Sequence, residues 1–403
     1  MDRRVWKIVM GAVVAAGLLA GAGLLGMRSY RSEKPTLAEG LRRVENADAE
    51  GVDQIEQALL RSGARDEAAV VRCAWLVRRA RYEQALNHLT PDMVAGPLSR
   101  HALRLAGESL FHLGQLDRAE SLLTQLVAES PDEVDAYRIL AVMYYDLGSP
   151  DLALKALSHV IRLAPLDYRP HHLTGVILTD NENFEAAAQQ FRLGLSKAPP
   201  AETKRAMQQE LAQVLIRHRD YQGALDALSE TQSSPATDTQ RAECVWSLGD
   251  SKQAVQLVDA VLADHPDHVN ALKLKARIVE EAGAGELAVK LLQQVLVKEP
   301  YDLDARYQLL QLYGSLGKND ERATELIEYN RYRALQDRLI KLNQQASLDP
   351  NAEAPRRELV EVCQALGRQK LADMWQRAAD YCARRQQGRK VQNDPPPATD
   401  LNP

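Results

Sequence analysis

The feature that most constrains this chain is an internal repeat with a period of 34 residues. Turn-like residues separate two helical patterns at Ala80, Gly114, Gly148, Glu182, Arg219, Gly249, Gly283 and Gly317. Successive turns lie 34 residues apart, except for one step of 37 that is followed by one of 30. Such a period indicates a stack of similar units, in which each unit buries its apolar face against its neighbours.

Small residues recur at two fixed distances from these turns. Seven places before the turn stand Cys73, Gly107, Ala141, Gly175, Ala212, Ala242 and Ala276. Five places after it stand Ala85, Ala119, Ala153, Ala187, Ala224, Ala254 and Ala288. Small side chains at two fixed points allow two antiparallel helices to approach closely where they cross. Each unit is therefore predicted to be a closely packed helix pair.

A proline closes each unit. It stands 17 places after the turn at Pro97, Pro131, Pro165, Pro199, Pro266 and Pro300, and one place earlier at Pro235. Proline lacks the backbone N–H and disfavours helix in the residue before it, so it separates one pair from the next.

This phase resembles that of the tetratricopeptide repeat family. Tyr82 or Phe184 follows the turn by two residues, Phe191 lies inside a second helix, and Pro199 closes that unit. The resemblance covers residues 66–325 closely. It implies an all-α fold, an α-solenoid of helix pairs wound into a right-handed superhelix. It also implies a concave face, lined by the first helix of each pair, that binds extended peptides or partner helices.

The remaining segments complete the predicted organisation. We predict an N-terminal tail and transmembrane anchor over 1–35, a divergent capping helix pair over 36–65, the repeat array over 66–325, a long polar helix over 326–350, a C-terminal repeat-like helix pair over 351–385 and a disordered tail over 386–403. The array holds about seven phased units plus one divergent unit. In that last unit, around Gly317, Leu310 and Arg322 replace the small pair, so altered packing is expected there.

The segment Ile8–Met27 carries no charge, and its length of about 20 residues is enough to cross a bilayer as a helix. Basic residues flank it, with Arg3 and Arg4 before it and Arg28 after it. These features predict a single-pass protein of a bacterial inner membrane, with the repeats outside the cytosol. The alternative is a cleavable signal peptide, for which Ala20–Ala22 offers a small-x-small cleavage site.

Composition argues against several other classes of function. The four cysteines have no regular spacing, so neither a zinc site nor a disulfide framework is expected. A net charge of -5 gives no general attraction to nucleic acid. No phosphate-binding loop or hydrolase motif occurs, and no stretch of about 100 residues is left for an independent catalytic domain. We therefore expect no enzymatic activity, no cofactor and no metal.

Candidate binding residues follow from the repeat phase. Ten places before the turn stand Arg104, Arg138, His172, Gln209, Thr239 and Lys273, and three places before it stand Phe111, Tyr145, Thr179, Ile216, Trp246 and Glu280. The predicted partner-binding groove comprises Arg104, Glu108, Phe111, Arg138, Tyr145, His172, Trp246 and Lys273. With Arg104 and Arg138 exposed, it could take an acidic, partly apolar segment. Alternatively, the arginines are merely solvated and the aromatic residues fill the space between repeats.

The predicted function is a membrane-anchored scaffold for protein–protein interaction. Two alternatives are an assembly or chaperone-like factor for envelope proteins and a non-catalytic targeting subunit of a separately encoded enzyme. Expected partners are other proteins or peptides and, through the N-terminal helix, the membrane, but not nucleic acid. A homodimer is possible, although nothing in the sequence supports one.

Overall fold

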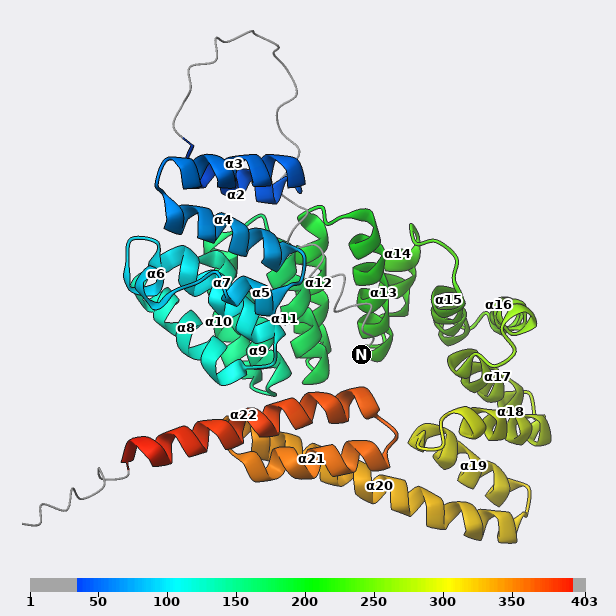
Figure 1. Ribbon diagram of the computed structural model, residues 1–403. Helices are drawn as coiled ribbons and strands as arrows, with labels where there is room; N and C mark the ends of the chain where they lie inside the picture. The colour runs from blue at the N-terminus through cyan, green and yellow to red at the C-terminus, as the bar shows by residue number, and fades with distance from the viewer. Residues whose placement is uncertain (1–34, 394–403) are drawn as a thin grey trace, which may run out of the picture. The chain divides into compact units, whose positions relative to one another are not determined.

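The computed structural model describes residues 35–393, and this part of the chain contains helices and no strand (Figure 1). The chain divides into two compact units. Unit 1 contains α2 (Leu37–Glu45), α3 (Ala49–Arg61), α4 (Arg65–Arg78), α5 (Tyr82–Leu86), α6 (Pro91–Ala95), α7 (Ser99–His112), α8 (Leu116–Glu129), α9 (Val134–Asp146) and α10 (Pro150–Leu163).

Unit 2 continues the same alternation of paired helices. It contains α11 (Arg169–Asp180), α12 (Phe184–Ser196), α13 (Ala201–Arg217), α14 (Tyr221–Leu228), α15 (Pro235–Ser247), α16 (Ser251–Asp264), α17 (Val269–Glu281), α18 (Gly285–Lys298), α19 (Leu303–Ser315), α20 (Asn319–Leu348) and nearly all of α21 (Glu353–Ala365). The last described helix, α22 (Gln369–Asn393), begins in unit 2, and its residues from Arg377 onward belong to unit 1.

The turn inside each helix pair contains one residue in the left-handed backbone conformation. All eight predicted turn residues have a positive φ, between 56° and 100°, including the non-glycine residues Ala80, Glu182 and Arg219. The amide after the turn bonds back to a carbonyl in the last turn of the first helix, as in Gln115 N–H to Leu110 O at 2.9 Å. This arrangement satisfies carbonyls that the helix end would otherwise leave unpaired. It therefore ends every first helix at the same phase.

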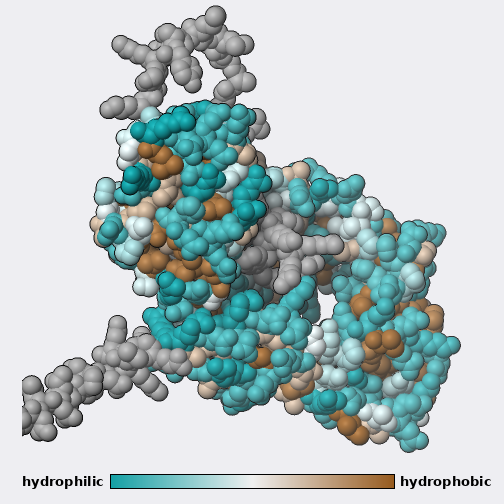
Figure 2. All heavy atoms as spheres, in the orientation of Figure 1, coloured by the Kyte–Doolittle hydropathy of each residue, from teal (hydrophilic) through white to brown (hydrophobic). Residues whose placement is uncertain are grey.

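The two small positions lie at the crossing of each pair. The alanines five places after the turn are fully buried in all seven units, from Ala85 to Ala288. A Cβ added to Gly175 would lie 2.9 Å from Cε1 of Phe191, and one added to Gly107 would lie 2.6 Å from Cγ of Leu123. The small residue therefore makes room for a large apolar side chain of the second helix. Apolar side chains gather at these crossings, and the face drawn in Figure 2 is mostly hydrophilic.

The pair α19 and α20 departs from this pattern. Nine places after the turn, the equivalent residues Leu123, Leu157, Phe191, Val258 and Leu292 are at most 3% exposed, whereas Leu326 is 46% exposed. In this pair Arg306 instead forms an ion pair with Glu325 and stacks over the ring of Tyr332 at 4.8 Å. The second helix thus presents a different face to the first, and it runs on for 30 residues.

The C-terminal helix is longer than expected. Residues 386–393 continue α22 as a helix, although the sequence predicts disorder over 386–403. Residues beyond Asn393 lie outside the described part of the chain.

The predicted location as a single-pass membrane protein is wrong on the structural evidence. Within residues 35–393, no helix is both long and apolar enough to cross a membrane. The longest, α20, has the length but carries charged side chains along it. The proposed anchor at Ile8–Met27 lies outside the described residues.

Replacing Glu182 or Arg219 by glycine should raise the free energy of unfolding by about 1 kcal/mol each, because glycine adopts positive φ without a Cβ clash. The measurement is the midpoint of urea denaturation followed by circular dichroism. The matched control, Gln189→Gly on the exposed face of α12, should lower stability by about 1 kcal/mol, because glycine is a poor helix former. A lower midpoint for both turn variants would contradict the strain assigned to these turns.

Candidate functional site

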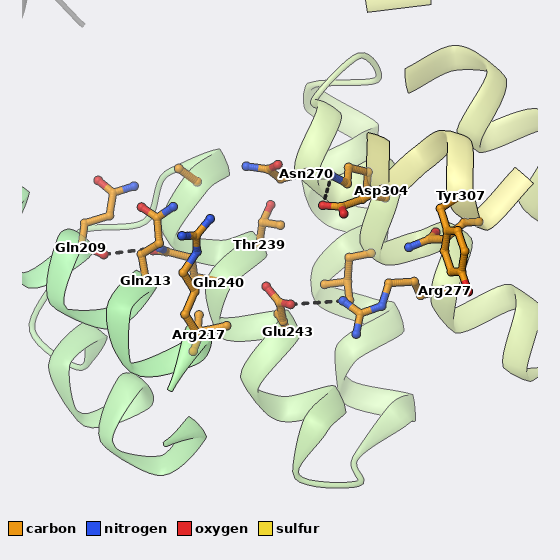
Figure 3. Close-up of a pocket in the computed structure, with 15 residues that line it drawn as sticks. Gln209, Gln213, Arg217, Thr239, Gln240, Glu243, Asn270, Arg277, Asp304 and Tyr307 are labelled. Atoms are coloured by element: carbon orange, nitrogen blue, oxygen red, sulfur yellow. Dashed lines mark hydrogen bonds and ion pairs between the residues drawn. The ribbon is translucent and has the colours of Figure 1, made fainter. Parts of the chain in front are cut away.

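A groove of about 500 Å³ runs across the first helices of four successive pairs in unit 2 (Figure 3). It is lined from α13 by Gln209, Gln213, Ile216 and Arg217, from α15 by Ala236, Thr239, Gln240 and Glu243, from α17 by Asn270, Lys273, Leu274 and Arg277, and from α19 by Asp304, Tyr307 and Gln308. No second helix of a pair contributes to it. The groove is therefore built by the repeat itself.

The lining residues occupy a small set of repeat positions. They stand 13, 10, 9, 6, 3 or 2 places before the turn, a spacing that keeps them on one side of each helix. The sequence predicted the positions 10 and 3 places before the turn and, in unit 1, Glu108 at six places before it; the positions 13, 9 and 2 places before the turn were not predicted. Extending the pattern by further steps of three and four residues would have added Glu243 and Arg277, which stand six places before their turns.

The charges of the groove are nearly balanced, and all of them except that of Arg217 lie in ion pairs between described residues. Its cations are Arg217, Lys273 and Arg277, and its carboxylates are Glu243 and Asp304. Arg277 lies 3.2 Å from Glu243 and stacks over the ring of Trp246 at 4.4 Å. Lys273 binds the Asp302 carboxylate at 2.7 Å and reaches Asp304 at 3.5 Å. The groove thus lacks the strongly basic character that an acidic ligand would need.

Carboxamide side chains are the most frequent polar groups in the groove. They are Gln209, Gln213, Gln240, Asn270 and Gln308. Gln240 donates from Nε2 to the backbone carbonyl of Gln209 at 3.3 Å. The Oε1 atoms of Gln240 and Gln308 are buried and have no hydrogen-bond partner among the described residues. Such acceptors are costly to leave unpaired, so they mark where a ligand donor would be stabilised.

The residues predicted on unit 1 are more buried than expected. The side chains of Arg104 and Arg138 are 22% and 21% exposed, whereas the sequence predicted exposed side chains. Arg104 lies 3.5 Å from Glu108, and Arg138 pairs with Asp135. Burial raises the pKa of Glu108, and the charge of Arg104 opposes that rise.

The predicted aromatic residues of unit 1 also lie partly inside the protein. Phe111 is 6% exposed and meets the ring of His112 edge-on at 5.2 Å, and Tyr145 is half-buried. The role of these unit 1 residues in binding stays a prediction.

The predicted residues in unit 2 have different surroundings. His172 is 4% exposed, hydrogen-bonds to Glu210 at 2.6 Å and lies beside the ring of Phe191. Trp246 does not line the groove but supports Arg277, and its Nε1 donates to Glu281 at 3.1 Å. Among the predicted set, Lys273 is the residue that lines the groove directly.

Comparisons with known proteins agree with the repeat pattern. A family model described as tetratricopeptide repeat matches residues 76–134, 104–168, 140–202 and 241–304. A curated relative, DnaJ homolog subfamily C member 3 of Gallus gallus, is 26% identical over 242 residues, 56% of this chain and 48% of the relative. The chain thus spans about half the length of that relative.

Several solved structures are also similar to the chain. PilF of Pseudomonas aeruginosa is 17% identical with a TM-score of 0.42, covering 54% of this chain and 97% of its own. A tetratricopeptide repeat protein of Parabacteroides merdae has the same identity and TM-score, covering 62% and 98%. YrrB, described as having an unusual peptide-binding site, is 17% identical with a TM-score of 0.37, covering 46% and 96%.

Removing the partner of Glu108 tests the electrostatics of the unit 1 residues. Arg104→Met should destabilise the protein by about 2 kcal/mol at pH 8, because it leaves a mostly buried carboxylate without its cation. The folded-state pKa of Glu108 is raised, so its contribution to stability is greatest at low pH and is lost as pH rises through that pKa. The loss of stability should therefore be smaller at pH 4.5 than at pH 8.

The double variant Arg104→Met with Glu108→Gln is the matched control, since it removes both charges. Its thermal denaturation midpoint should depend less on pH than that of Arg104→Met alone. Equal pH dependence of the single and double variants would show that Glu108 is not the group responsible.

Proposed function

We propose that this chain, which contains tetratricopeptide repeats, is a scaffold that binds other proteins by holding their extended segments in the groove of unit 2. The observation that carries the proposal is that α13, α15, α17 and α19 line the groove from overlapping sets of repeat positions, and that all four helices contribute the residue ten places before the turn. Four stacked helices that present equivalent positions at regular intervals suit a ligand that is itself repetitive along its length. The backbone of an extended peptide has this property.

The polar groups of the groove are better suited to hydrogen-bond the backbone of a peptide than to bind its charged terminus. A carboxamide both donates and accepts hydrogen bonds, and so does each peptide unit of a ligand. After rotation of the two side chains toward the groove, the buried and unpartnered Oε1 atoms of Gln240 and Gln308 would accept from ligand N–H groups. Each such bond contributes about 1 kcal/mol, and it also relieves the cost of a buried unpaired acceptor.

The spacing of these two glutamines sets a minimum ligand length. Gln240 is on α15 and Gln308 is on α19, with α17 between them. Packed helices lie about 8–10 Å apart, so the two side chains are separated by roughly 16–20 Å. An extended peptide advances about 3.3 Å per residue, and five or six residues would span that distance.

The side chains that line the groove indicate which side chains a ligand should have. Ile216, Leu274 and Tyr307 offer apolar contacts, and Tyr307 is 51% exposed. Because Glu243 and Arg277 are paired with each other, a charged ligand group would have to displace one of them, which favours uncharged polar groups of the ligand at this point. We therefore infer a ligand of mixed polarity, in contrast to the acidic segment expected from the sequence.

The test uses a random 12-residue peptide library displayed on phage and selected on the full chain. Selected peptides should bind with a dissociation constant that rises at least about tenfold in Gln240→Leu with Gln308→Leu, because two hydrogen bonds are lost. Leucine is similar in volume to glutamine, so the groove stays filled. Fluorescence anisotropy of labelled peptides measures the affinity.

The matched control is Gln253→Leu with Gln294→Leu, on exposed faces of α16 and α18 outside the groove. It should bind the selected peptides as the unmodified chain does. A failure to select any peptide, or equal affinity in the groove and control variants, would refute groove binding.

A further inference from the structure

The C-terminal part of α22 packs on a surface of unit 1 that is remote in sequence. Hydrogen bonds between α22 and α8 or the turn before it join residues 261 to 270 positions apart. Both sides of this contact belong to unit 1. The contact does not repeat along the solenoid, so the stacking of successive repeats does not account for it.

Glu120 of α8 is the centre of this contact. Its side chain is 14% exposed, and its carboxylate accepts hydrogen bonds from the hydroxyls of Tyr144, at 3.0 Å, and Tyr381. Arg385 also binds the same carboxylate and contacts Tyr381. Two of these three donors come from α22, so much of the environment of Glu120 is supplied by the end of the chain.

Two further carboxylates of unit 1 face cations of α22. Arg384 lies 3.1 Å from Asp117 and donates to the carbonyl of Gly114 at 3.2 Å. Burial raises the pKa of Asp146 to about 6, and the nearby positive charge of Arg377 opposes that rise. Asp117, Glu120 and Asp146 thus form, with Tyr144, an acidic surface on α8 and α9 that we call the acidic edge.

The residues that meet the acidic edge share one side of α22. Arg377, Tyr381, Arg384 and Arg385 are spaced by four, three and one residues, which places them along a single helical face. Ala378 and Cys382 are fully buried beside them. This segment therefore has the features of a basic amphipathic helix seated on a complementary surface.

The ion pairs that Arg384 and Arg385 form with α8 are of the kind that exchange. The side chains of Arg384 and Arg385 are 43% and 35% exposed, and ion pairs of such partly exposed side chains contribute little to stability and weaken with salt. Being part of the same chain gives the segment a high effective concentration, which keeps it in place despite weak individual contacts.

We propose that the acidic edge is a docking site for a basic amphipathic helix of a partner, and that the C-terminal part of α22 is its displaceable intramolecular occupant. The partner helix would present arginines and a tyrosine with the spacing found in α22. This site is independent of the groove proposed on unit 2, because it lies on other helices and favours positive charge, whereas the charges of the groove are nearly balanced. Its occupation by α22 would keep the site closed until a competing helix arrives.

The probe for this proposal is a fluorescent synthetic peptide comprising residues 369–393. In the full chain, Arg384→Glu with Arg385→Glu should release the internal segment, and the vacated surface should bind the probe at least about tenfold more tightly than the unmodified chain does. Adding Glu120→Arg to that variant should remove the gain. Hydrogen exchange of residues 377–386 should also become faster in the released variant.

The control is Arg331→Glu with Arg333→Glu, which reverses two charges on an exposed stretch of α20 where the arginines are 64% and 61% exposed. It should bind the probe as weakly as the unmodified chain. If the double reversal at 384 and 385 loses helical circular dichroism, Tyr381→Phe with Arg384→Gln replaces it. Unchanged probe affinity and unchanged exchange in the released variant, or equal probe binding by the control, would overturn the proposal.

Discussion

The structure depends on a close crossing of two helices that is repeated along the chain. In the phased units the first helix carries a glycine, alanine or cysteine at the crossing, and there Gly175 faces Phe191 as Gly107 faces Leu123. Close-packed interiors tolerate little change in volume, so this contact sets the position of one helix against the other. Because the left-handed turn ends each first helix at the same phase, equivalent residues of successive pairs fall in register. The groove on α13, α15, α17 and α19 is a direct result of that register.

The pair α19 and α20 shows what happens when the crossing is lost. Leu310 and Arg322 are too large for a close approach, and an ion pair between Arg306 and Glu325 takes over the contact. A buried ion pair is stable only if its remaining donors are also hydrogen-bonded. Arg306 meets this requirement by donating from Nε and Nη2 to the carbonyl of Pro300. The second helix therefore turns another face inward, and the register that builds the groove does not continue beyond α19.

Features that repeat along the chain could be predicted from the sequence, whereas the specific pairs that side chains form could not. The turns, the small pairs and the closing prolines recur at fixed spacing, so each one supports the others. The groove was found only in part, since Lys273 was identified while Gln240 and Gln308 were missed. The burial of Arg104 could not be foreseen, because it depends on pairing with Glu108 and on the neighbouring helix. The contact of Tyr381 with Glu120 joins residues 261 positions apart and belongs to no repeat.

The two surfaces argued for here use electrostatics in opposite ways. In the groove, Lys273 and Arg277 are paired with carboxylates of the protein, so a charged ligand group at either residue must displace an existing pair and gains little net energy. Selectivity there must come from carboxamides and apolar contacts. At the acidic edge, the carboxylates of α8 and α9 meet cations that come from α22, so removing that helix leaves several negative charges close together. Like charges held in proximity favour the return of a cation, and this favours a basic helix as occupant over an uncharged one.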